Sequence, residues 1–365
     1  MPALALVDAQ DAEHWQAVAQ AAGWQTIVPG GASAGPIDTR VQAVAAAVHA
    51  AIESGTVDPS RIYLAGRGGA AATVFYTMSR LPDVFAAGIA VGGSPEAALA
   101  TGRVYAVNLA NAPLLWVSAN DADEATAKKL KDAGMWLEWR SASEMKNGDV
   151  FAWLAAHTRD PFPLGVDCET DSPSFPSCFW LQPDKFDTGE RNDVLPRTLV
   201  AAAAPASLDF GAFGYKPDDP GPGVLVSHLP EKYSGPLKLG DRIMELDGHP
   251  IADAHEFQLM MSKATEAAHA AVMVQRAKQR IRLETRILVP QHNFLPTARV
   301  QGKYDPDLKQ ILVVSRGVAA MRMTVPDAWA GASLFWNGLT LQQLDRPGCV
   351  LLSIDKELLH ARACM

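Results

Sequence analysis

Residues 61–76 read Arg-Ile-Tyr-Leu-Ala-Gly-Arg-Gly-Gly-Ala-Ala-Ala-Thr-Val-Phe-Tyr, and this stretch decides the fold expected for the first part of the chain. It opens with an apolar run, Ile62 to Ala65, which predicts a buried strand. Gly66, Gly68 and Gly69 follow and predict a tight turn, because glycine adopts backbone angles that other residues avoid. The apolar residues after the turn predict a helix. The stretch therefore predicts a strand, a sharp turn and a helix.

The composition indicates a folded chain of two or three domains. It has 365 residues, of which 48% are hydrophobic, with 28 glycines and 25 prolines, and this is far from a disordered composition. The net charge of -8 and the lack of a Lys/Arg cluster argue against a nucleic-acid partner. The sequence has no run of 18 apolar residues, so no transmembrane segment is predicted.

The N-terminus and the cysteines bear on the compartment. No signal sequence is expected, because residues 3–7 form too short an apolar run and predict a strand, so a cytoplasmic location is the default. A periplasmic location remains open if a leader was removed. A bridge between Cys168 and Cys178 would indicate an oxidising compartment, whereas four unpaired thiols, with Cys349 and Cys364, are the preferred interpretation. No cysteine spacing matches a metal site, and no metal is expected.

The predicted elements alternate between strand and helix up to about residue 163. Further strands are expected at 25–28, 86–91, 113–117 and 136–140, and further helices at 11–22, 38–55, 123–134 and 149–158. This alternation predicts a mostly parallel sheet covered by helices on both faces, hence an α/β fold for residues 1–163.

The remainder of the chain predicts three further segments. Residues 164–203 are rich in proline and glycine and are expected to be a linker or the first part of a β domain. Residues 204–290 predict a compact unit with a strand, a glycine-marked turn, a helix and two more strands. Residues 291–365 alternate in polarity and predict an antiparallel, β-sandwich-like unit.

The first 160 residues resemble an α/β-hydrolase of the esterase and dienelactone-hydrolase group. The resemblance is carried by residues 62–70 (Ile-Tyr-Leu-Ala-Gly-Arg-Gly-Gly-Ala), 80–93 (Arg-Leu-Pro-Asp-Val-Phe-Ala-Ala-Gly-Ile-Ala-Val-Gly-Gly) and 112–121 (Ala-Pro-Leu-Leu-Trp-Val-Ser-Ala-Asn-Asp). In such enzymes a G-x-S-x-G turn, the nucleophile elbow, exposes the catalytic serine. The resemblance places Gly68 at the serine position and Asp121, with Asp123 as the near alternative, at the acid position.

The sequence lacks the other catalytic parts that the resemblance implies. The loop 141–148 after the last strand contains no histidine, and His157 lies in or at the end of a helix, where a capping or surface role is expected. Where the family has a His-Gly pair, residues 8–11 read Asp-Ala-Gln-Asp, and two carboxylates there would repel an oxyanion. We therefore expect no catalytic residues, a vestigial elbow (Gly66, Gly68, Gly69) and a vestigial acid (Asp121).

Two other interpretations of the elbow region are weaker. Gly66-x-Gly68-x-x-Ala71 also fits a dinucleotide fingerprint, but the next strand ends in Gly92-Gly93-Ser94 and lacks the acidic residue that would hold a ribose, so no cofactor is expected. A displaced nucleophile would be Ser94 or Cys178. Ser94 is better explained as a helix start and Cys178 as a core residue.

Residues 205–290 resemble a bacterial-type PDZ domain. The resemblance is carried by residues 237–251, Leu-Lys-Leu-Gly-Asp-Arg-Ile-Met-Glu-Leu-Asp-Gly-His-Pro-Ile, whose Ile243 and Leu246 are expected to face a small core. It implies that a peptide C-terminus adds a strand at the edge near residues 212–216. The implied peptide-binding residues are Phe210, Gly211, Ala212, Phe213 and Gly214 in the carboxylate-binding loop, and Phe257, Met260 and Met261 in the helical wall of the groove. A degenerate module with Phe210 and Phe213 in its core is the alternative.

The last unit resembles a small β-sandwich appended to some bacterial esterase-like proteins. Its aromatic residues Trp329 and Trp336 are expected to pack with Trp180, so that the PDZ-like unit is an insertion in the sandwich.

These features lead to three hypotheses of function. The first is a pseudoenzyme that binds a partner protein or a peptide C-terminus, either as a monomer or within a homo-oligomer. The second is an esterase or peptidase with an unconventional nucleophile. The third is a structural or assembly subunit.

Overall fold

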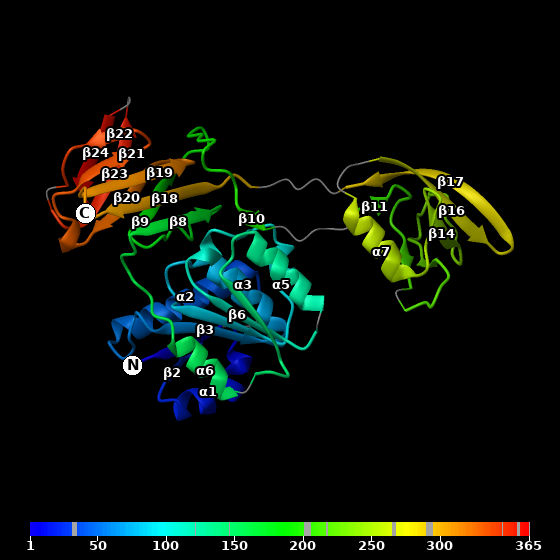
Figure 1. Ribbon diagram of the computed structural model, residues 1–365, viewed down its shortest axis with the longest axis horizontal. Coiled ribbons are helices and arrows are strands. Elements are labelled where there is room, and N and C mark those ends of the chain that lie inside the picture. Colours follow the sequence, from blue (N-terminus) through cyan, green and yellow to red (C-terminus); the bar gives the residue numbers. More distant parts are fainter. Residues whose placement is uncertain are drawn as a thin grey trace. The chain divides into compact units, whose positions relative to one another are not determined.

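The computed structural model describes residues 1–30, 35–120, 122–145, 147–200, 206–216, 218–264, 268–289, 295–344, 346–355 and 358–364. The chain forms two compact units (Figure 1). Unit 1 consists of residues 1–201 and 294–365, and unit 2 consists of residues 202–293. No helix in the described ranges is long and apolar enough to span a membrane.

A parallel sheet flanked by helices forms the N-terminal part of unit 1, as the α/β prediction requires. Its strand order is β2-β1-β3-β4-β6-β7, and all five pairings are parallel. The strands are β1 (Ala3–Leu6), β2 (Gln25–Ile27), β3 (Ile62–Arg67), β4 (Ala87–Val91), β6 (Leu114–Ser118) and β7 (Leu137–Ser141). Because both faces are covered, apolar residues occupy consecutive positions of β3 instead of alternating with polar ones.

The helices cover the two faces of this sheet (Figure 1). They are α1 (Ala12–Ala21), α2 (Ile37–Glu53), α3 (Ala71–Arg80), α4 (Glu96–Leu99), α5 (Ala122–Asp132) and α6 (Asn147–Ala155), with short 3-10 turns η1 (Ala9–Asp11), η2 (Gly68–Ala70) and η3 (Asn108–Ala110). Trp15 of α1 and Phe151 of α6 pack in one core with Tyr63 of β3. Trp24 stacks on Tyr63, with ring centroids 4.7 Å apart.

A β domain completes unit 1 with two antiparallel-rich sheets. One sheet has the order β22-β21-β19-β18-β8 and the other β24-β23-β20-β9. The strands are β8 (Gly165–Thr170), β9 (Leu181–Phe186), β18 (Ala298–Asp305), β19 (Gln310–Arg316), β20 (Val318–Val325), β21 (Ser333–Trp336), β22 (Leu339–Leu341), β23 (Gly348–Asp355) and β24 (Leu358–Ala363), with the turn η4 (Asp327–Trp329). A separate two-stranded pair joins β5 (Val104–Tyr105) to β10 (Leu199–Val200). In the sequence, β8 and β9 precede unit 2 and the other strands follow it. Each sheet therefore combines one strand from before unit 2 with strands from after it.

Aromatic side chains fill the core of the β domain. Trp180, Trp336 and Trp329 are buried. Trp180 meets Trp329 edge to face at a centroid distance of 5.0 Å, and Tyr304 stacks on Trp329 at 4.4 Å. Trp180, which precedes unit 2 in the sequence, therefore packs in one core with Trp329 and Trp336, which follow it, as predicted.

All four cysteines are paired, so the preferred prediction of free thiols is wrong. Cys168 bonds to Cys178, and Cys349 bonds to Cys364. The register of β23 and β24 aligns residue 350 with residue 363 and places Cys349 beside Cys364, whose N–H donates to the Cys349 carbonyl at 3.1 Å. Strand pairing between residues 15 positions apart in sequence brings the thiols together.

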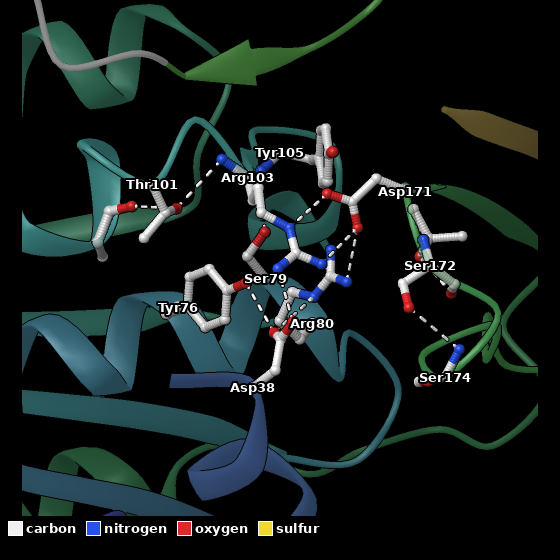
Figure 2. Close-up of polar contacts among 12 residues, drawn as sticks. Asp38, Tyr76, Ser79, Arg80, Thr101, Arg103, Tyr105, Asp171, Ser172 and Ser174 are labelled. Carbon is white, nitrogen blue, oxygen red and sulfur yellow. Dashed lines mark hydrogen bonds and ion pairs between the residues drawn. The ribbon is translucent and has the colours of Figure 1, made fainter. Parts of the chain in front are cut away.

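Buried ion pairs join the β domain to the parallel-sheet domain (Figure 2). The Asp171 carboxylate, whose side chain is 0% exposed, lies 2.7 Å from Nη2 of Arg80 at the end of α3 and accepts from Nε of Arg103 at 2.6 Å. Arg103 also donates to Asp38 of α2 at 2.6 Å, and the Tyr76 hydroxyl donates to Asp38 at 2.8 Å. Residues far apart in sequence thus share one charge network.

The pKa of Asp171 follows from its two arginine partners. Burial alone would raise the pKa, but the hydrogen bond from Arg103 and the charges of Arg80 and Arg103 outweigh it and hold the pKa below its ordinary value. A lowered folded-state pKa means that the pair stabilises the protein above the unfolded pKa of about 3.9 and that this contribution is lost as the pH falls through the folded pKa.

Unit 2 is an antiparallel sheet with one helix. Its strand order is β11-β17-β16-β14-β13-β12, with β15 paired to β14. The elements are β11 (Ser207–Leu208), β12 (Gly214–Tyr215), β13 (Val224–His228), β14 (Arg242–Leu246), β15 (His249–Pro250), α7 (Ala254–Lys263), β16 (Ala268–Arg276) and β17 (Gln279–Leu288). Ile243 and Leu246 face the core, as predicted. Asp247 and Gly248, at φ 51° and 79°, turn the chain between β14 and β15.

The substitution Asp171→Asn tests the link between the two domains of unit 1. It leaves two arginines facing a neutral partner, so we expect the free energy of unfolding of unit 1 to fall by about 3–5 kcal/mol at pH 7 and the difference from wild type to shrink at acid pH. All nine tryptophans lie in unit 1, so tryptophan fluorescence during urea unfolding reports on this unit. The control is Asp184→Asn, which removes the more exposed pair with Arg322 and should cost no more than about 1 kcal/mol. Equal losses in the two variants would contradict the assignment.

Candidate functional site

The turn after β3 has the backbone of an elbow but no side chain at its apex. Gly68 follows the end of β3 with φ +54°, a conformation that residues with a Cβ rarely adopt. A Cβ built on Gly68 would meet no atom within 4 Å, so a side chain at this position would extend into open space. The structure thus presents position 68 outward, and the position carries only backbone.

The other glycines of the turn have different roles. A Cβ on Gly66 would lie 2.6 Å from Cγ2 of Val7 and 2.8 Å from Cγ2 of Val74, so glycine is needed for close packing of β1, β3 and α3. A Cβ on Gly93, after β4, would lie 2.0 Å from the Gly68 carbonyl oxygen. Gly69 has open space around its Cβ position. Close packing is therefore the reason for Gly66 and Gly93, and the left-handed backbone is the reason for Gly68.

Acidic side chains lie beside the elbow at the carboxyl end of β1. Strand order reverses between β1 and β3, which is where parallel α/β sheets commonly form their sites. Asp11 accepts the Arg67 N–H at 2.9 Å, so its carboxylate is held at the start of the elbow. Burial raises the pKa of Asp11, although its bond to the Arg67 backbone opposes this. Asp8 accepts from the Gln10 N–H at 2.9 Å.

His14, in α1, is a titratable residue near the elbow that the motifs in the sequence did not indicate. It lies one turn beyond Asp11, and burial and the positive charge of Arg67 lower its pKa while Asp11 raises it. His14 lies in α1, three residues after Asp11, whose carboxylate is bonded to Arg67 at the start of the elbow. An Asp-x-x-His spacing at a helix start is the sequence signal that could have indicated it.

The predicted acid position is only partly described. Asp121 lies outside the described residues. The alternative, Asp123, accepts a short hydrogen bond from the Ser118 hydroxyl at the end of β6, and Asn120 Nδ2 lies 3.4 Å from its other oxygen. This carboxylate is therefore engaged within the β6–α5 connection.

His157 lies at the opposite end of the sheet from the elbow. Its carbonyl accepts from the Tyr63 hydroxyl at 2.9 Å, and its ring contacts Trp153 and Trp136 at centroid distances of 4.6 and 6.1 Å. With Trp136 and Phe85 it lines a cavity of about 300 Å³ formed by residues that precede β4, β6 and β7. Because the strands are parallel, this is the amino-terminal edge, whereas the elbow follows the carboxyl end of β3. His157 cannot act at Gly68.

The two displaced nucleophiles considered for this region are otherwise occupied. The Ser94 hydroxyl accepts from the Glu96 N–H at 3.2 Å at the start of α4, in agreement with a helix-start role. Cys178 is bonded to Cys168 and has no free thiol. Cys178 is thus not the buried free thiol that the preferred prediction assumed.

Unit 2 places some predicted peptide-binding residues in its core and others at a surface loop. Phe210, Phe257 and Met261 are 3%, 4% and 2% exposed, respectively, and belong to the hydrophobic core, and Met260 packs against that core. Gly211 and Ala212 line an open cavity of about 330 Å³. The cavity is lined by Asp209, Phe210, Gly211, Ala212, Pro230, Lys232, Tyr233, Ser234, Gly235 and Pro236.

The loop ahead of β12 carries unpaired backbone donors. Gly211 has φ +76°. Within the described part of the chain, the N–H groups of Gly211, Ala212 and Phe213 donate to no protein acceptor. Gly214 and Tyr215 then form β12, which pairs with β13 on one side and is the last strand of its sheet. Successive free N–H groups in a loop suit an anion, and an edge strand suits another strand.

Comparison with known proteins gives matches in solved structures alone. No known family and no curated protein matches the sequence. Similar structures include a thermostable esterase (16% identity, TM-score 0.27, 33% of this chain and 37% of that one) and the esterase PE8 (15%, 0.32, 42% and 92%). A variant of Arabidopsis thaliana SOBER1 is also similar (15%, 0.31, 42% and 97%). These neighbours correspond to the N-terminal part of the chain and its parallel sheet. The chain spans about a third of the length of the first neighbour. Identities and TM-scores this low give no information on the activity of this chain.

Alanine substitutions at the elbow glycines should separate their roles. Gly66→Ala should lower the free energy of unfolding of unit 1 by about 1–3 kcal/mol through overpacking. Gly68→Ala should cost about 1–2 kcal/mol through its left-handed backbone. The control Gly69→Ala, which meets open space, should stay within about 0.5 kcal/mol. Tryptophan fluorescence in urea gives the three values, and a loss in Gly69→Ala as large as that in Gly66→Ala would refute the packing explanation.

Proposed function

We propose that this chain is a hydrolase-like protein without hydrolytic activity, and that it binds the C-terminal segment of a partner protein through unit 2. The observation that carries the proposal is the elbow: its apex is positioned to expose a side chain, and the residue there is Gly68. Backbone atoms alone cannot attack an ester or a peptide bond. Nucleophilic catalysis therefore lacks its reagent at the position where this architecture would present it.

The surroundings of the elbow also support binding without catalysis. Asp11 is held at the elbow by the Arg67 N–H. A carboxylate in that place would oppose the negative charge that develops during acyl transfer. His157 is at the far edge of the sheet. His14 is near the elbow, but a base without a nucleophile to activate does not complete a catalytic set.

The binding role of unit 2 is inferred from an edge strand next to free backbone donors. A peptide in extended form would add to β12, and its terminal carboxylate would accept from the N–H groups of residues 211–213. Lys232 lines the adjoining cavity and supplies a positive charge for the peptide's terminal carboxylate. Asp209 lines the same cavity and would disfavour an acidic side chain on the peptide. The occupant that fits is an extended, C-terminal peptide segment.

The two disulfides support an oxidising compartment for this protein. Structural disulfides persist in secreted and periplasmic proteins and are rare in the cytosol. We therefore favour the periplasmic alternative over the cytoplasmic default, and this choice agrees with a protein that recognises partners outside the cytosol.

Absence of hydrolysis is the first expected result. The full chain should release no nitrophenol from p-nitrophenyl acetate or butyrate above the buffer rate and should not be labelled by a fluorophosphonate probe, because no serine occupies the elbow. An active esterase assayed in parallel provides the positive control. Covalent labelling, or turnover abolished by a single Ser or His substitution, would overturn the non-catalytic proposal.

Dependence on a free carboxylate is the second expected result. Heptapeptides are titrated against the full chain and followed by fluorescence anisotropy. Peptides with a free C-terminus should bind at least about tenfold more tightly than the same peptides with an amidated C-terminus, because the amide lacks the negative charge that accepts from the loop N–H groups. Lys232→Ala should weaken binding several-fold, whereas Lys278→Ala, in the β16–β17 turn, should not. Equal binding of acid and amide forms would exclude this carboxylate site.

A further inference from the structure

Resting on the proposed binding at β12, we propose that Tyr215 and Gln258 form a latch between β12 and α7 that restricts the last side chain of the bound peptide to small residues. The side-chain amide of Gln258 donates to the Tyr215 hydroxyl at 2.9 Å. This hydrogen bond joins the edge strand of the sheet to the helix beside it. The latch is defined as this residue pair.

Aromatic contacts hold the Tyr215 ring between the strand and the helix. The ring meets Phe257 of α7 edge to face, with centroids 5.8 Å apart at 87°. Phe213, just before β12, lies 6.5 Å from the same ring. Phe257 is buried in the core of unit 2, so it gives the Tyr215 ring a fixed surface to pack against. A strand added to β12, the last strand of its sheet, would run beside Tyr215, and we infer that its last side chain would meet these rings.

The hydrogen bond of the latch is weak, so the latch can open when a peptide binds. The hydrogen bond of Gln258 is exposed to solvent, whereas the ring contacts are partly buried. Neutral, exposed hydrogen bonds contribute little net free energy, because water replaces the lost partner. A peptide can therefore break the hydrogen bond, but a large last side chain must also displace the ring from Phe257. Glycine, alanine or serine at the last position avoids this displacement.

The register of β12 is consistent with such a constraint. The pairing of β12 with β13 shifts between Gly214 and Tyr215, and a Cβ on Gly214 would lie 3.1 Å from Cβ of His228. A shift in register re-aims the side chain that follows it. Tyr215 is thus directed toward α7 by the backbone of the strand as well as by its ring contacts.

The test uses the full chain and an array of heptapeptides that share six residues and end in each of the twenty amino acids with a free carboxylate. The wild type should prefer small last residues. Tyr215→Ala should shift the preference by at least about tenfold toward leucine and phenylalanine, because it vacates the space beside Phe257. Tyr215→Phe and Gln258→Ala each remove the hydrogen bond and keep the other ring contacts, so each should strengthen binding of peptides with large last residues by about two- to threefold.

Controls separate the latch from the proposed function. Gln275→Ala removes a glutamine of β16 whose amide donates to the Ala277 carbonyl, and its preference should match the wild type. If Tyr215→Ala misfolds, the conservative Tyr215→Phe still reports on the latch. Binding with the same last-residue preference in the wild type and all latch variants overturns the latch and leaves the proposed function standing. Failure of the wild type and every variant to bind any peptide on the array overturns both.

Discussion

Three carboxylates at alternating positions of one strand, each paired with arginine, hold unit 1 together. Asp167, Glu169 and Asp171 lie along β8 and the residue after it. Asp167 pairs with Arg299 at 2.6 Å and Glu169 with Arg316 at 2.8 Å, and Asp171 pairs with Arg80 and Arg103. The side chains of Glu169 and Asp171 are 0% exposed, so removing their arginine partners would leave a charge with little water around it. The first two pairs join β8 to β18 and β19 within the β domain, and the third joins it to the parallel-sheet domain.

Neutral polar contacts complete this junction. The Asn108 side-chain Nδ2 donates to the backbone carbonyls of Ser79 and Glu169 at 2.5 and 2.7 Å, and its Oδ1 accepts from the Glu169 N–H at 2.7 Å. A buried amide satisfied on both sides orients the segments that it joins, because its hydrogen bonds require defined positions for donor and acceptor. The β domain is therefore positioned on α3, the helix that leaves the elbow, so the junction and the elbow share one element.

The elbow shows how glycine holds a strained turn between a strand and a helix. A residue with a side chain at φ +54° carries backbone strain, and enzymes retain such strain where it positions a reactive group. Glycine adopts the same angle without that strain. In this chain Gly68 keeps the geometry of the turn, and Gly66 and Gly93 keep the close packing beneath it. The fold has no structural need for a larger residue at the apex.

The sequence by itself determined the strand–turn–helix unit at residues 61–80, the parallel α/β sheet, and the core positions Ile243 and Leu246. These follow from local signals: a short apolar run, glycines at required backbone angles, and the spacing of buried side chains. Tertiary structure alone decided the cysteine pairing, because Cys349 and Cys364 meet through strand register, and the arginine partners of β8, which come from residues up to 147 positions away. It also decided the edge of the sheet at which His14 and His157 lie. Parallel strands send their two ends to opposite edges, so His14 comes to the elbow and His157 is carried away from it.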